Sequence, residues 1–391
     1  MPTGRRLIAA LVVINGACGE RGIPETMTVR DSAGVRIVEH GYLDDDSTLR
    51  LADAPLYRVG WQEDEPRFDH VVSGVVLSDG RAAIGDRGTS TVAILAADGI
   101  LEANLGGQGQ GPGEIGFLIS VSRIGGDTVV VEDDGNGRLS LYHDMEYVGT
   151  VGADDGYDAW SLMVIGTDEL GLLFQRASFP SPSFRESWLP GYVARMDIHS
   201  AVVDTLLTYD WVPNRRIYTD VRFTPEGVVG TTQGTILVGR SDAPEVRRRN
   251  FDNTVESLRW HSERPVMTDS LWGVYEEYFM GNPVVTLDTD SRRALFDRMR
   301  FRRGEPLPYF GALLGDEEGN VWVADFTTDL RTHGACHVFD PDGSWLGRVS
   351  LPPRSRILDI AGGRMLLVEM DDLGVQAIAL YELIHAAATG N

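Results

Sequence analysis

The sequence predicts an all-β protein, a six-bladed β-propeller closed by an N-terminal strand, with a small helical insertion between blades four and five. From residue 69 onward, short runs of alternating or β-branched apolar residues are separated by Asp-Gly, Gly-Asn and Gly-Gly pairs. Helical periodicity is nearly absent before residue 268. One antiparallel unit recurs six times along the chain. A unit of about forty residues cannot bury both faces of its sheet alone, and radial stacking of such sheets solves this problem.

The clearest copy of the unit is "VVVEDDGNGRLSLYHDMEYVGTVG" (129–152), which reads as three strands joined by two turns. It aligns without a gap on the first copy, so that Asp133 falls on Asp86. The copies in blades three and five are looser, and each contains an insertion or a longer turn. The six copies are residues 82–106, 129–152, 169–197, 235–251, 319–349 and 364–383.

The ring also needs a closing strand, because the last copy supplies three strands and leaves an edge unpaired. The segment "LYRVGW" (56–61) has the pattern of an outermost strand, so we expect it to complete the sixth blade. The segment "GVRIVEHG" (34–41) is a second candidate for this role or for an extra strand beside it.

The glycine-rich segment "GGQGQGPGEIGF" (106–117) could be a phosphate-binding loop or a turn. A phosphate loop needs a following helix and usually a lysine, and neither is expected here. We therefore interpret it as the connection from the outer strand of blade one to the inner strand of blade two, where glycine provides the backbone freedom.

Two groups of residues carry a resemblance to known proteins. The strand, turn and second strand of 129–143 resemble the NHL repeat, at Asp133, Gly135, Asn136 and Arg138, and "GQGQGPGEI" resembles the linker between NHL blades. The segments 29–41 and 79–94 resemble a large group of bacterial envelope proteins known as six-bladed β-propellers. The resemblance covers most of residues 29–383 and is strongest for blades one, two, five and six. It implies fold and location but little about activity, since propellers serve unrelated functions.

The composition restricts the partners. The formal net charge of −23 disfavours nucleic acid and anionic membrane surfaces. All 35 basic residues are arginine, which excludes Schiff-base chemistry and a lysine general base.

The N-terminus resembles an export signal. Two arginines precede an apolar run, Leu7–Ile14, which is too short to cross a bilayer that needs about twenty residues. Small residues then precede Cys18, as in the signal of bacterial lipoproteins, in which this cysteine is lipidated. The alternatives are a simple secreted protein and a short packed helix. We expect an exported protein of the cell envelope, anchored through Cys18 and facing the periplasm or the exterior.

The expected organisation is a signal peptide (1–17), an N-terminal tether and first strand (18–48), the propeller (49–385), a helical cap insertion within it (264–310) and a tail (386–391). In the insertion, 268–279 is expected to be a helix with Thr268 as its cap, and 290–304 a second helix packed through Leu295 and Met299.

Arginines of the insertion, among them Arg298 and Arg300, together with Arg247, Arg248 and Arg249, could form a positive rim for an anionic ligand. The alternative interpretation pairs them with some of the 58 acidic residues.

The symmetry of the repeat also defines a ring position at the end of the second strand of each blade. Its occupants are Asp86, Asp133, Gln175, Arg240, Asp325 and Glu369. These residues, with Arg138, are candidates for binding. The alternative is that they brace turns by accepting backbone N–H bonds.

Candidates for catalysis are weaker. His333, Cys336 and His337 are metal-binding types, but adjacent strand residues face opposite sides of a sheet. Acidic clusters at 43–47, 132–137 and 287–291 lack a regular calcium loop. We assign no catalytic residue, metal ligand or cofactor, and calcium belongs to the alternative, enzymatic interpretation.

The sequence therefore favours a scaffold that binds a protein, peptide or glycan on the face covered by the helices. The alternative is a calcium-dependent lactonase- or lyase-like propeller, which would need several Asp, Glu, Asn or His side chains at the axis. The inner strands "VVSGVVLS" (71–78) and "SRILDI" (355–360) are mostly apolar, which favours binding over catalysis.

Overall fold

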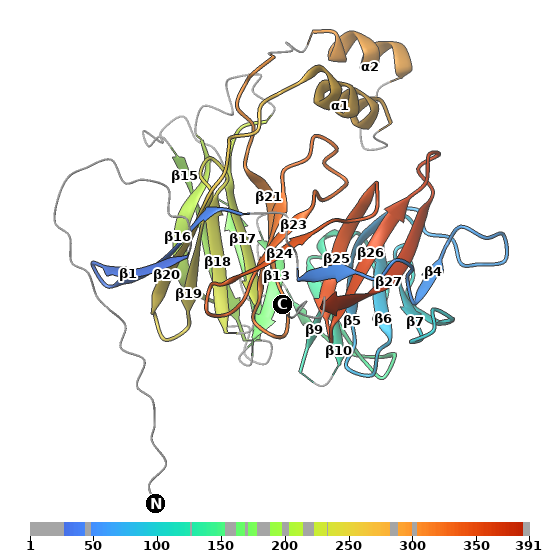
Figure 1. The fold of residues 1–391 in the computed structure, drawn as a ribbon. Helices are drawn as coiled ribbons and strands as arrows, with labels where there is room; N and C mark the ends of the chain where they lie inside the picture. Colours follow the sequence, from blue (N-terminus) through green and yellow to red (C-terminus); the bar gives the residue numbers. More distant parts are fainter. Residues whose placement is uncertain are drawn as a thin grey trace, which may run out of the picture.

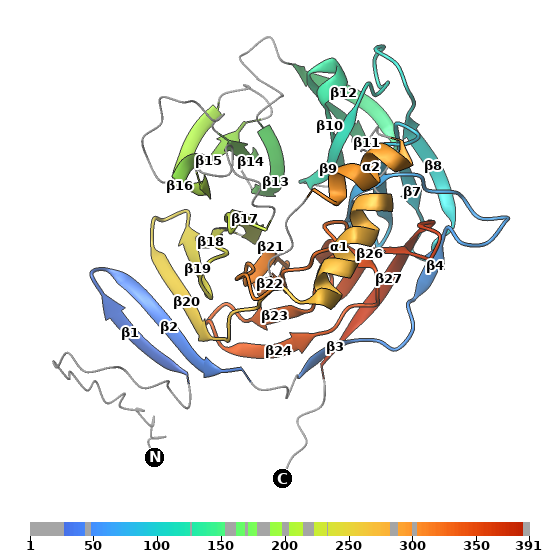
Figure 2. The ribbon, with the colours of Figure 1, turned by 90° about the horizontal axis from the view of Figure 1, so that it is seen from above.

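The structure, a computed structural model, shows six β-sheets arranged radially around an axis (Figures 1 and 2), as predicted. It describes residues 27–43, 48–125, 127–152, 162–168, 171–177, 188–197, 203–213, 223–232, 234–281, 288–298 and 303–385. The predicted signal peptide, Cys18 and the tail lie outside the described residues.

Each blade is an antiparallel sheet whose first strand lies innermost. The strands of blades one to three are β5 (Val71–Val76), β6 (Ala82–Asp86), β7 (Thr91–Leu95), β8 (Leu101–Gly106), β9 (Leu118–Ile124), β10 (Thr128–Asp133), β11 (Arg138–His143), β12 (Glu146–Gly152), β13 (Leu162–Asp168), β14 (Gly171–Ala177), β15 (Trp188–Met196) and β16 (Val203–Pro213). Those of blades four to six are β17 (Gly227–Thr232), β18 (Thr235–Arg240), β19 (Glu245–Asn250), β20 (Val255–His261), β21 (Phe310–Gly315), β22 (Val321–Asp325), β23 (Cys336–Phe339), β24 (Trp345–Val349), β25 (Ser355–Ala361), β26 (Arg364–Met370) and β27 (Gln376–His385).

The ring is closed by the N-terminal part of the chain. Strand β4 (Tyr57–Val59), within the predicted segment 56–61, pairs antiparallel with β27, and so does β3 (Leu49–Leu51). The last blade thus takes its outer edge from residues that precede the first blade, which confirms the predicted closure.

Residues 34–41 form a strand, as expected, but the strand lies neither at the edge of the sixth blade nor beside residues 56–61. They form β2 (Val35–Tyr42), which pairs with β1 (Thr28–Ser32) and adds in parallel to β20, so that blade four becomes a six-stranded sheet. The side chain of Val38 is buried in the core between blades four and five, and His40 Nε2 lies 2.7 Å from the carbonyl oxygen of Gly343 in blade five. The edge of β20 offers a longer pairing partner than the sixth blade, whose edge is already taken by β3 and β4.

The hydrophobic core lies in layers between neighbouring blades. Because side chains alternate along a strand, one strand can fill two layers. In β6, Ala83 packs with blade two and Ile84 with blade six, and every residue of this strand is buried. Blades approach closely where a side chain is missing, since a Cβ on Gly85 would lie 2.7 Å from Val121 Cγ2.

The glycine-rich segment 106–117 connects β8 to β9, as predicted. Gly106 has φ of +88°, and a Cβ there would lie 2.4 Å from the Cδ1 of Ile115, which is fully buried. Only glycine fits this conformation and this contact.

Two helices lie on one end of the ring, which we call the capped face (Figure 1). Helix α1 (Asp269–Gly281) begins after Thr268, whose hydroxyl accepts the N–H of Leu271 at 3.2 Å, as predicted. Helix α2 (Thr289–Phe296) is shorter than the predicted 290–304. Its buried residue is Phe296, which packs on α1, whereas the predicted contact Leu295 is exposed. The aromatic ring lies on the face turned to α1 and fills that space. Met299 and Arg300 lie outside the described residues.

In the described parts of the chain, we find no helix of the length and apolarity that a membrane span requires.

Candidate functional site

The ring position lies at the capped face, because the second strand of each blade ends where the first begins. Asp86, Asp133, Arg240 and Asp325 are the last residues of β6, β10, β18 and β22. Gln175 and Glu369 lie close to the ends of β14 and β26. The side chains at this position differ in what they contact.

Asp86 is buried and accepts three backbone N–H bonds, from Asp69, His70 and Gly88, at 3.0, 2.9 and 2.9 Å. It therefore ties the end of β6 to the chain that enters β5. Three N–H groups from two segments of the chain donate to one carboxylate, so this contact braces the turn.

Asp133 is fully buried and makes the equivalent contacts in blade two. Its Oδ1 accepts the N–H groups of Gly116 and Phe117 at 2.9 Å and of Asn136 at 3.3 Å, and Arg138 Nε lies 3.5 Å from its Oδ2. Both aspartates thus have the bracing contacts that we gave as the alternative to binding.

Arg138 also serves the connection between blades. Its guanidinium donates to the carbonyl oxygens of Gly111 and Glu114 at 2.6 Å each. The conformation of the glycine-rich segment is thereby held by a charged side chain of the following blade.

Glu369 joins the N-terminal closing strand to blade six. Arg58 of β4 donates Nε–H to it at 2.7 Å, and the hydroxyl of Tyr381 donates to it at 2.7 Å. Asp325 pairs with Arg348 at 2.6 Å and lies 3.6 Å from His337.

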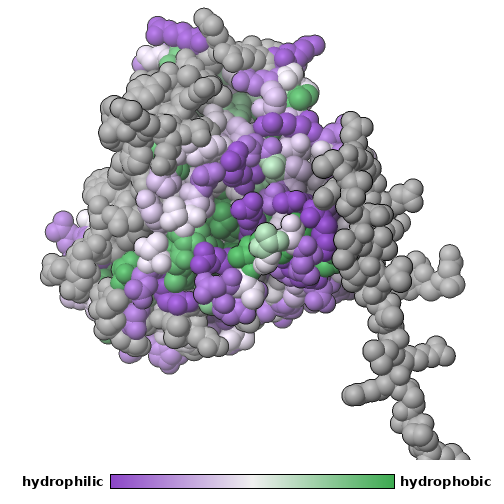
Figure 3. All heavy atoms as spheres, turned by 90° about the vertical axis from the view of Figure 1, so that its left-hand side faces the viewer, coloured by the Kyte–Doolittle hydropathy of each residue, from purple (hydrophilic) through white to green (hydrophobic). Residues whose placement is uncertain are grey.

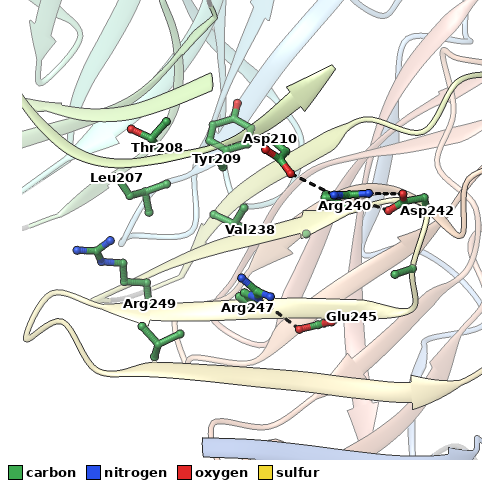
Figure 4. Close-up of a pocket in the computed structure, with 13 residues that line it drawn as sticks. Leu207, Thr208, Tyr209, Asp210, Val238, Arg240, Asp242, Glu245, Arg247 and Arg249 are labelled. Atoms are coloured by element: carbon green, nitrogen blue, oxygen red, sulfur yellow. Dashed lines mark hydrogen bonds and ion pairs between the residues drawn. The ribbon is translucent and has the colours of Figure 1, made fainter. Parts of the chain in front are cut away.

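Arg240 lies at the side wall between blades three and four (Figure 4). It pairs with Asp242 at 2.6 Å and Asp210 at 3.1 Å, and its guanidinium stacks 4.3 Å over Trp188. A groove of about 630 Å³ runs beside it, with Arg247 and Arg249 on β19 pointing into the same space.

This groove is charged but balanced. Arg247 pairs with Glu245 at 3.3 Å, and Arg249 donates to Asn253 at 2.8 Å. On this side of the molecule, hydrophilic side chains predominate around a band of hydrophobic ones (Figure 3). Exposed ion pairs of this kind are ordinary surface features, so the groove gives no specific indication of a ligand.

The arginines of the insertion follow the same pattern. Arg293 pairs with Glu276, and Arg303 pairs with Asp269. Arg248, the middle arginine of β19, is buried and pairs with Glu256. Arg298 is exposed just after α2. These contacts match the interpretation in which arginines pair with acidic residues.

The channel entrance at the capped face contains basic groups that the sequence analysis did not identify. They lie where the inner strands begin, and we call them the entrance cluster: His70, Arg87, His333 and Arg356. They come from blades one, five and six. Because inner strands line the axis of a propeller, side chains at their starts lie near one end of the channel.

Hydrogen bonds fix two of these side chains. Arg356 donates to the carbonyl oxygens of Val71 and Val72 at 2.9 and 3.1 Å, which joins blade six to blade one. Arg87 donates Nε–H to the carbonyl of Leu118 at 2.7 Å and stacks 4.6 Å over Phe117. Within the described residues, neither guanidinium has a carboxylate at ion-pair distance.

The titration of the cluster reflects this lack of counter-charge. Burial lowers the pKa of Arg356 to about 10 and lowers that of Arg87. Burial, Arg87 and Arg356 together lower the pKa of His70 despite the opposing effect of Asp86 and Asp69. The site therefore holds positive charge at a cost, which an anion would relieve.

His333 contributes a neutral donor. Its Nδ1 accepts the backbone N–H of Ile357 at 3.2 Å, so the ring proton of the neutral form is on Nε2. Burial, followed by the charge of Arg356, lowers the pKa of His333 to about 3. Cys336 is fully buried in β23, and burial raises the pKa of its thiol.

We expect this histidine to make the protein sensitive to mild acid. The pKa of His333 is about 3 in the folded protein and 6.5 in the unfolded chain. Below pH 6.5 the unfolded chain therefore binds more protons than the folded protein, and the free energy of unfolding decreases as the pH is lowered. When the pH is lowered from about 6.5 to about 5, the free energy of unfolding of His333→Gln should therefore decrease by about 2 kcal/mol less than that of the wild type. Urea unfolding across this range measures the difference, with exposed His143→Gln as the control. Equal losses in the wild type and both variants would show that His333 does not titrate in this way.

The lower half of the channel, away from the helices, is a separate hollow of about 300 Å³ lined by all six inner strands. Its charged lining residues are Arg123 on β9 and Asp359 on β25. Arg123 pairs with Glu317 at 2.5 Å, and Glu317 follows β21 of blade five. Since blades two and five are opposite each other in a ring of six, this ion pair crosses the channel.

In the ranges that the structure describes, no three His, Cys, Asp or Glu side chains gather in a way that could hold an ion.

Comparison with known proteins gives the fold. No protein-family profile and no curated protein sequence matches the chain. A solved structure of a protein described as exported, from Bacteroides fragilis, is 11% identical with a TM-score of 0.51, over 89% of this chain and 99% of that chain. A DUF4221-family structure from Bacteroides vulgatus is 9% identical with a TM-score of 0.53, over 88% and 100%. At these identities the likeness shows the propeller fold alone.

Proposed function

We propose that this protein is an exported cell-envelope propeller that binds a carboxylate-bearing ligand at the capped entrance of its channel. The observation that carries the proposal is the entrance cluster, in which Arg87, Arg356 and the Nε2–H of His333 are all donors. Donors without acceptors of matching charge favour an anion, and guanidinium groups match the planar geometry of a carboxylate.

The surroundings support this role. Asp86 accepts three backbone N–H bonds and, among the described residues, forms no ion pair with Arg87 or Arg356, whose printed acceptors are neutral carbonyl oxygens. The helices on the same face give the entrance a wall, with Thr328 of blade five bonded to the carbonyl of Leu271 in α1 at 2.9 Å. A few convergent polar groups commonly fix the orientation of a ligand in its site.

The calcium-dependent enzyme is the less favoured alternative. Calcium takes six to eight oxygen ligands, including several carboxylates. Among the described residues that line the lower channel, only Asp359 carries a carboxylate, and the entrance carries positive charge. A calcium ion would be repelled by the positive charge of the entrance, and in the lower channel it would lack enough oxygen ligands.

Binding of small carboxylates tests the proposal. N-acetyl-alanyl-alanine should bind in isothermal titration calorimetry, whereas its C-terminal amide should not. Arg87→Gln should weaken binding by about tenfold or more, because it removes a charge-assisted hydrogen bond. Arg247→Gln, an exposed arginine of the side groove, is the matched control and should change nothing. Equal binding of the acid and the amide, or an unaffected Arg87→Gln variant, would contradict the proposal.

Glucuronate, tested in the same way, distinguishes an acidic sugar from a peptide as the source of the carboxylate. The location in the cell envelope and the lipid on Cys18 are part of the proposal. Cell fractionation of the wild type and Cys18→Ser tests them, since the variant should leave the membrane fraction.

A further inference from the structure

The lower channel is chemically unlike the entrance and lies at its opposite end. Its wall carries hydroxyl groups, including Ser73, Ser120 and Thr231, between the charged residues Arg123 and Asp359. Its volume of about 300 Å³ is at the lower limit of pockets that hold small molecules. A ligand here would be small and polar.

Asp359 is the unusual group of this hollow. It accepts the N–H groups of Val76 and Ile360 at 2.8 and 2.9 Å, and part of its surface stays open to the channel. Among the described residues no cation lies at ion-pair distance from it. Burial raises the pKa of Asp359 to about 6. Near neutral pH it is therefore an ionised carboxylate without a counter-ion, at a cost in free energy.

Arg123 lines the same hollow, and its charge opposes the rise in the pKa of Asp359, but no ion pair joins the two side chains among the described residues. Arg123 is paired elsewhere. It pairs with Glu317 at 2.5 Å and lies 3.6 Å from Asp127, and although burial opposes it, the bond to Glu317 raises the pKa of Arg123. Glu317 also accepts the N–H of Gly362 at 3.2 Å, so the pair is anchored on blades two, five and six. Three carboxylates and one guanidinium leave this end of the channel negative.

The hydroxyl groups add acceptors. The Ser73 Oγ accepts the N–H of Val121 at 2.6 Å, and Thr231 donates its hydroxyl to the carbonyl of Ile165 at 3.0 Å. Ser120 donates to Glu132, a buried carboxylate that also accepts the N–H of Val164, at 2.6 and 3.4 Å. Each hydroxyl oxygen that donates in this way keeps lone pairs for a ligand's N–H groups.

We propose that the lower channel binds a small organic cation, an alkylammonium group whose N–H bonds go to Asp359 and whose carbon chain lies against Leu358 and Val164. This site is distinct from the proposed carboxylate site and does not depend on it. A divalent metal suits it less, since one carboxylate cannot provide the oxygen ligands that such ions require.

The probe is n-butylammonium, with n-butanol as its uncharged counterpart, in isothermal titration calorimetry on the mature protein. We expect saturable binding of the amine at about pH 7.5 and none of the alcohol. At about pH 5 only about a tenth of Asp359 is ionised, so binding should weaken about tenfold. Asp359→Asn keeps a side-chain oxygen for Val76 N–H and should abolish binding at the higher pH.

The carboxylate site at the entrance and the ammonium site in the lower channel can be tested independently of each other. Arg87→Gln should bind the amine normally, and Asp359→Asn should bind the acetylated dipeptide normally. Amine binding that persists in Asp359→Asn, that is insensitive to pH in the wild type, or that the alcohol reproduces would overturn the inference. No detectable amine binding at millimolar concentration would also overturn it. The pH comparison uses the wild type, so it remains valid even if the variant folds poorly.

Discussion

Glu369→Ala is expected to destabilise the protein by about 3 kcal/mol, because it removes the acceptor that joins the closing strand to the last blade. Arg58 donates to Glu369 at 2.7 and 3.3 Å, and Tyr381 donates at 2.7 Å. The hydrogen bond from Arg58 to Glu369 is the main cause of the raised pKa of Arg58. Without Glu369 the guanidinium and the hydroxyl are left between strands without their carboxylate.

Urea unfolding followed by circular dichroism measures the loss. Glu382→Ala, an exposed glutamate of the neighbouring strand β27, is the matched control and should cost little. The double variant Arg58→Met with Glu369→Leu should recover most of the stability, since replacing both partners by apolar groups leaves no unpaired charge. A loss below about 0.5 kcal/mol in Glu369→Ala would mean that this network does not hold the ring closed.

Asp133→Ala is expected to cost about 3 kcal/mol as well. The carboxylate is fully buried and satisfies the N–H groups of Gly116, Phe117 and Asn136, which lie between blades one and two. Alanine leaves these donors buried without an acceptor, and each costs about 1 kcal/mol or more. Glu146→Ala, which removes an exposed carboxylate from the same blade, is the control.

The same variant separates bracing from binding. If Asp133 braces the turn, Asp133→Ala lowers the free energy of unfolding but leaves the affinity for the acetylated dipeptide unchanged under folding conditions. If stability stayed the same and affinity fell, Asp133 would belong to a ligand site.

The fold was readable from the sequence because local and long-range signals agree. The repeated unit places equivalent residues at equivalent sites, so Asp86 and Asp133 could be aligned before their contacts were known. Segment 56–61 was assigned correctly because only one blade lacked an outer strand. The alternation in segment 34–41 identifies a strand but not its partner. Blade four already has four strands of its own, so counting strands gives no sign that a fifth strand adds to it in parallel.

The candidate site was harder to predict. The entrance cluster combines Arg87, which follows a ring position, with Arg356 near the start of an inner strand and His333 in a long turn. A comparison of the residues at the starts of the inner strands could have identified Arg356. A catalytic channel is expected to present acidic, amide and histidine side chains, which directs attention away from arginine, and the inner strand 355–360 is mostly apolar in sequence although it contains Arg356 and Asp359. Their proximity to other blades depends on ring closure, which no local pattern encodes.

A crystal soaked in sodium selenate tests anion binding at the entrance most directly, because anomalous scattering from selenium locates the anion. We expect an anomalous peak at hydrogen-bond distance from Arg87, Arg356 or His333 Nε2 in the wild type, and the loss of this peak in Arg87→Gln. Selenate bound only elsewhere on the molecule, with the entrance empty, would contradict it.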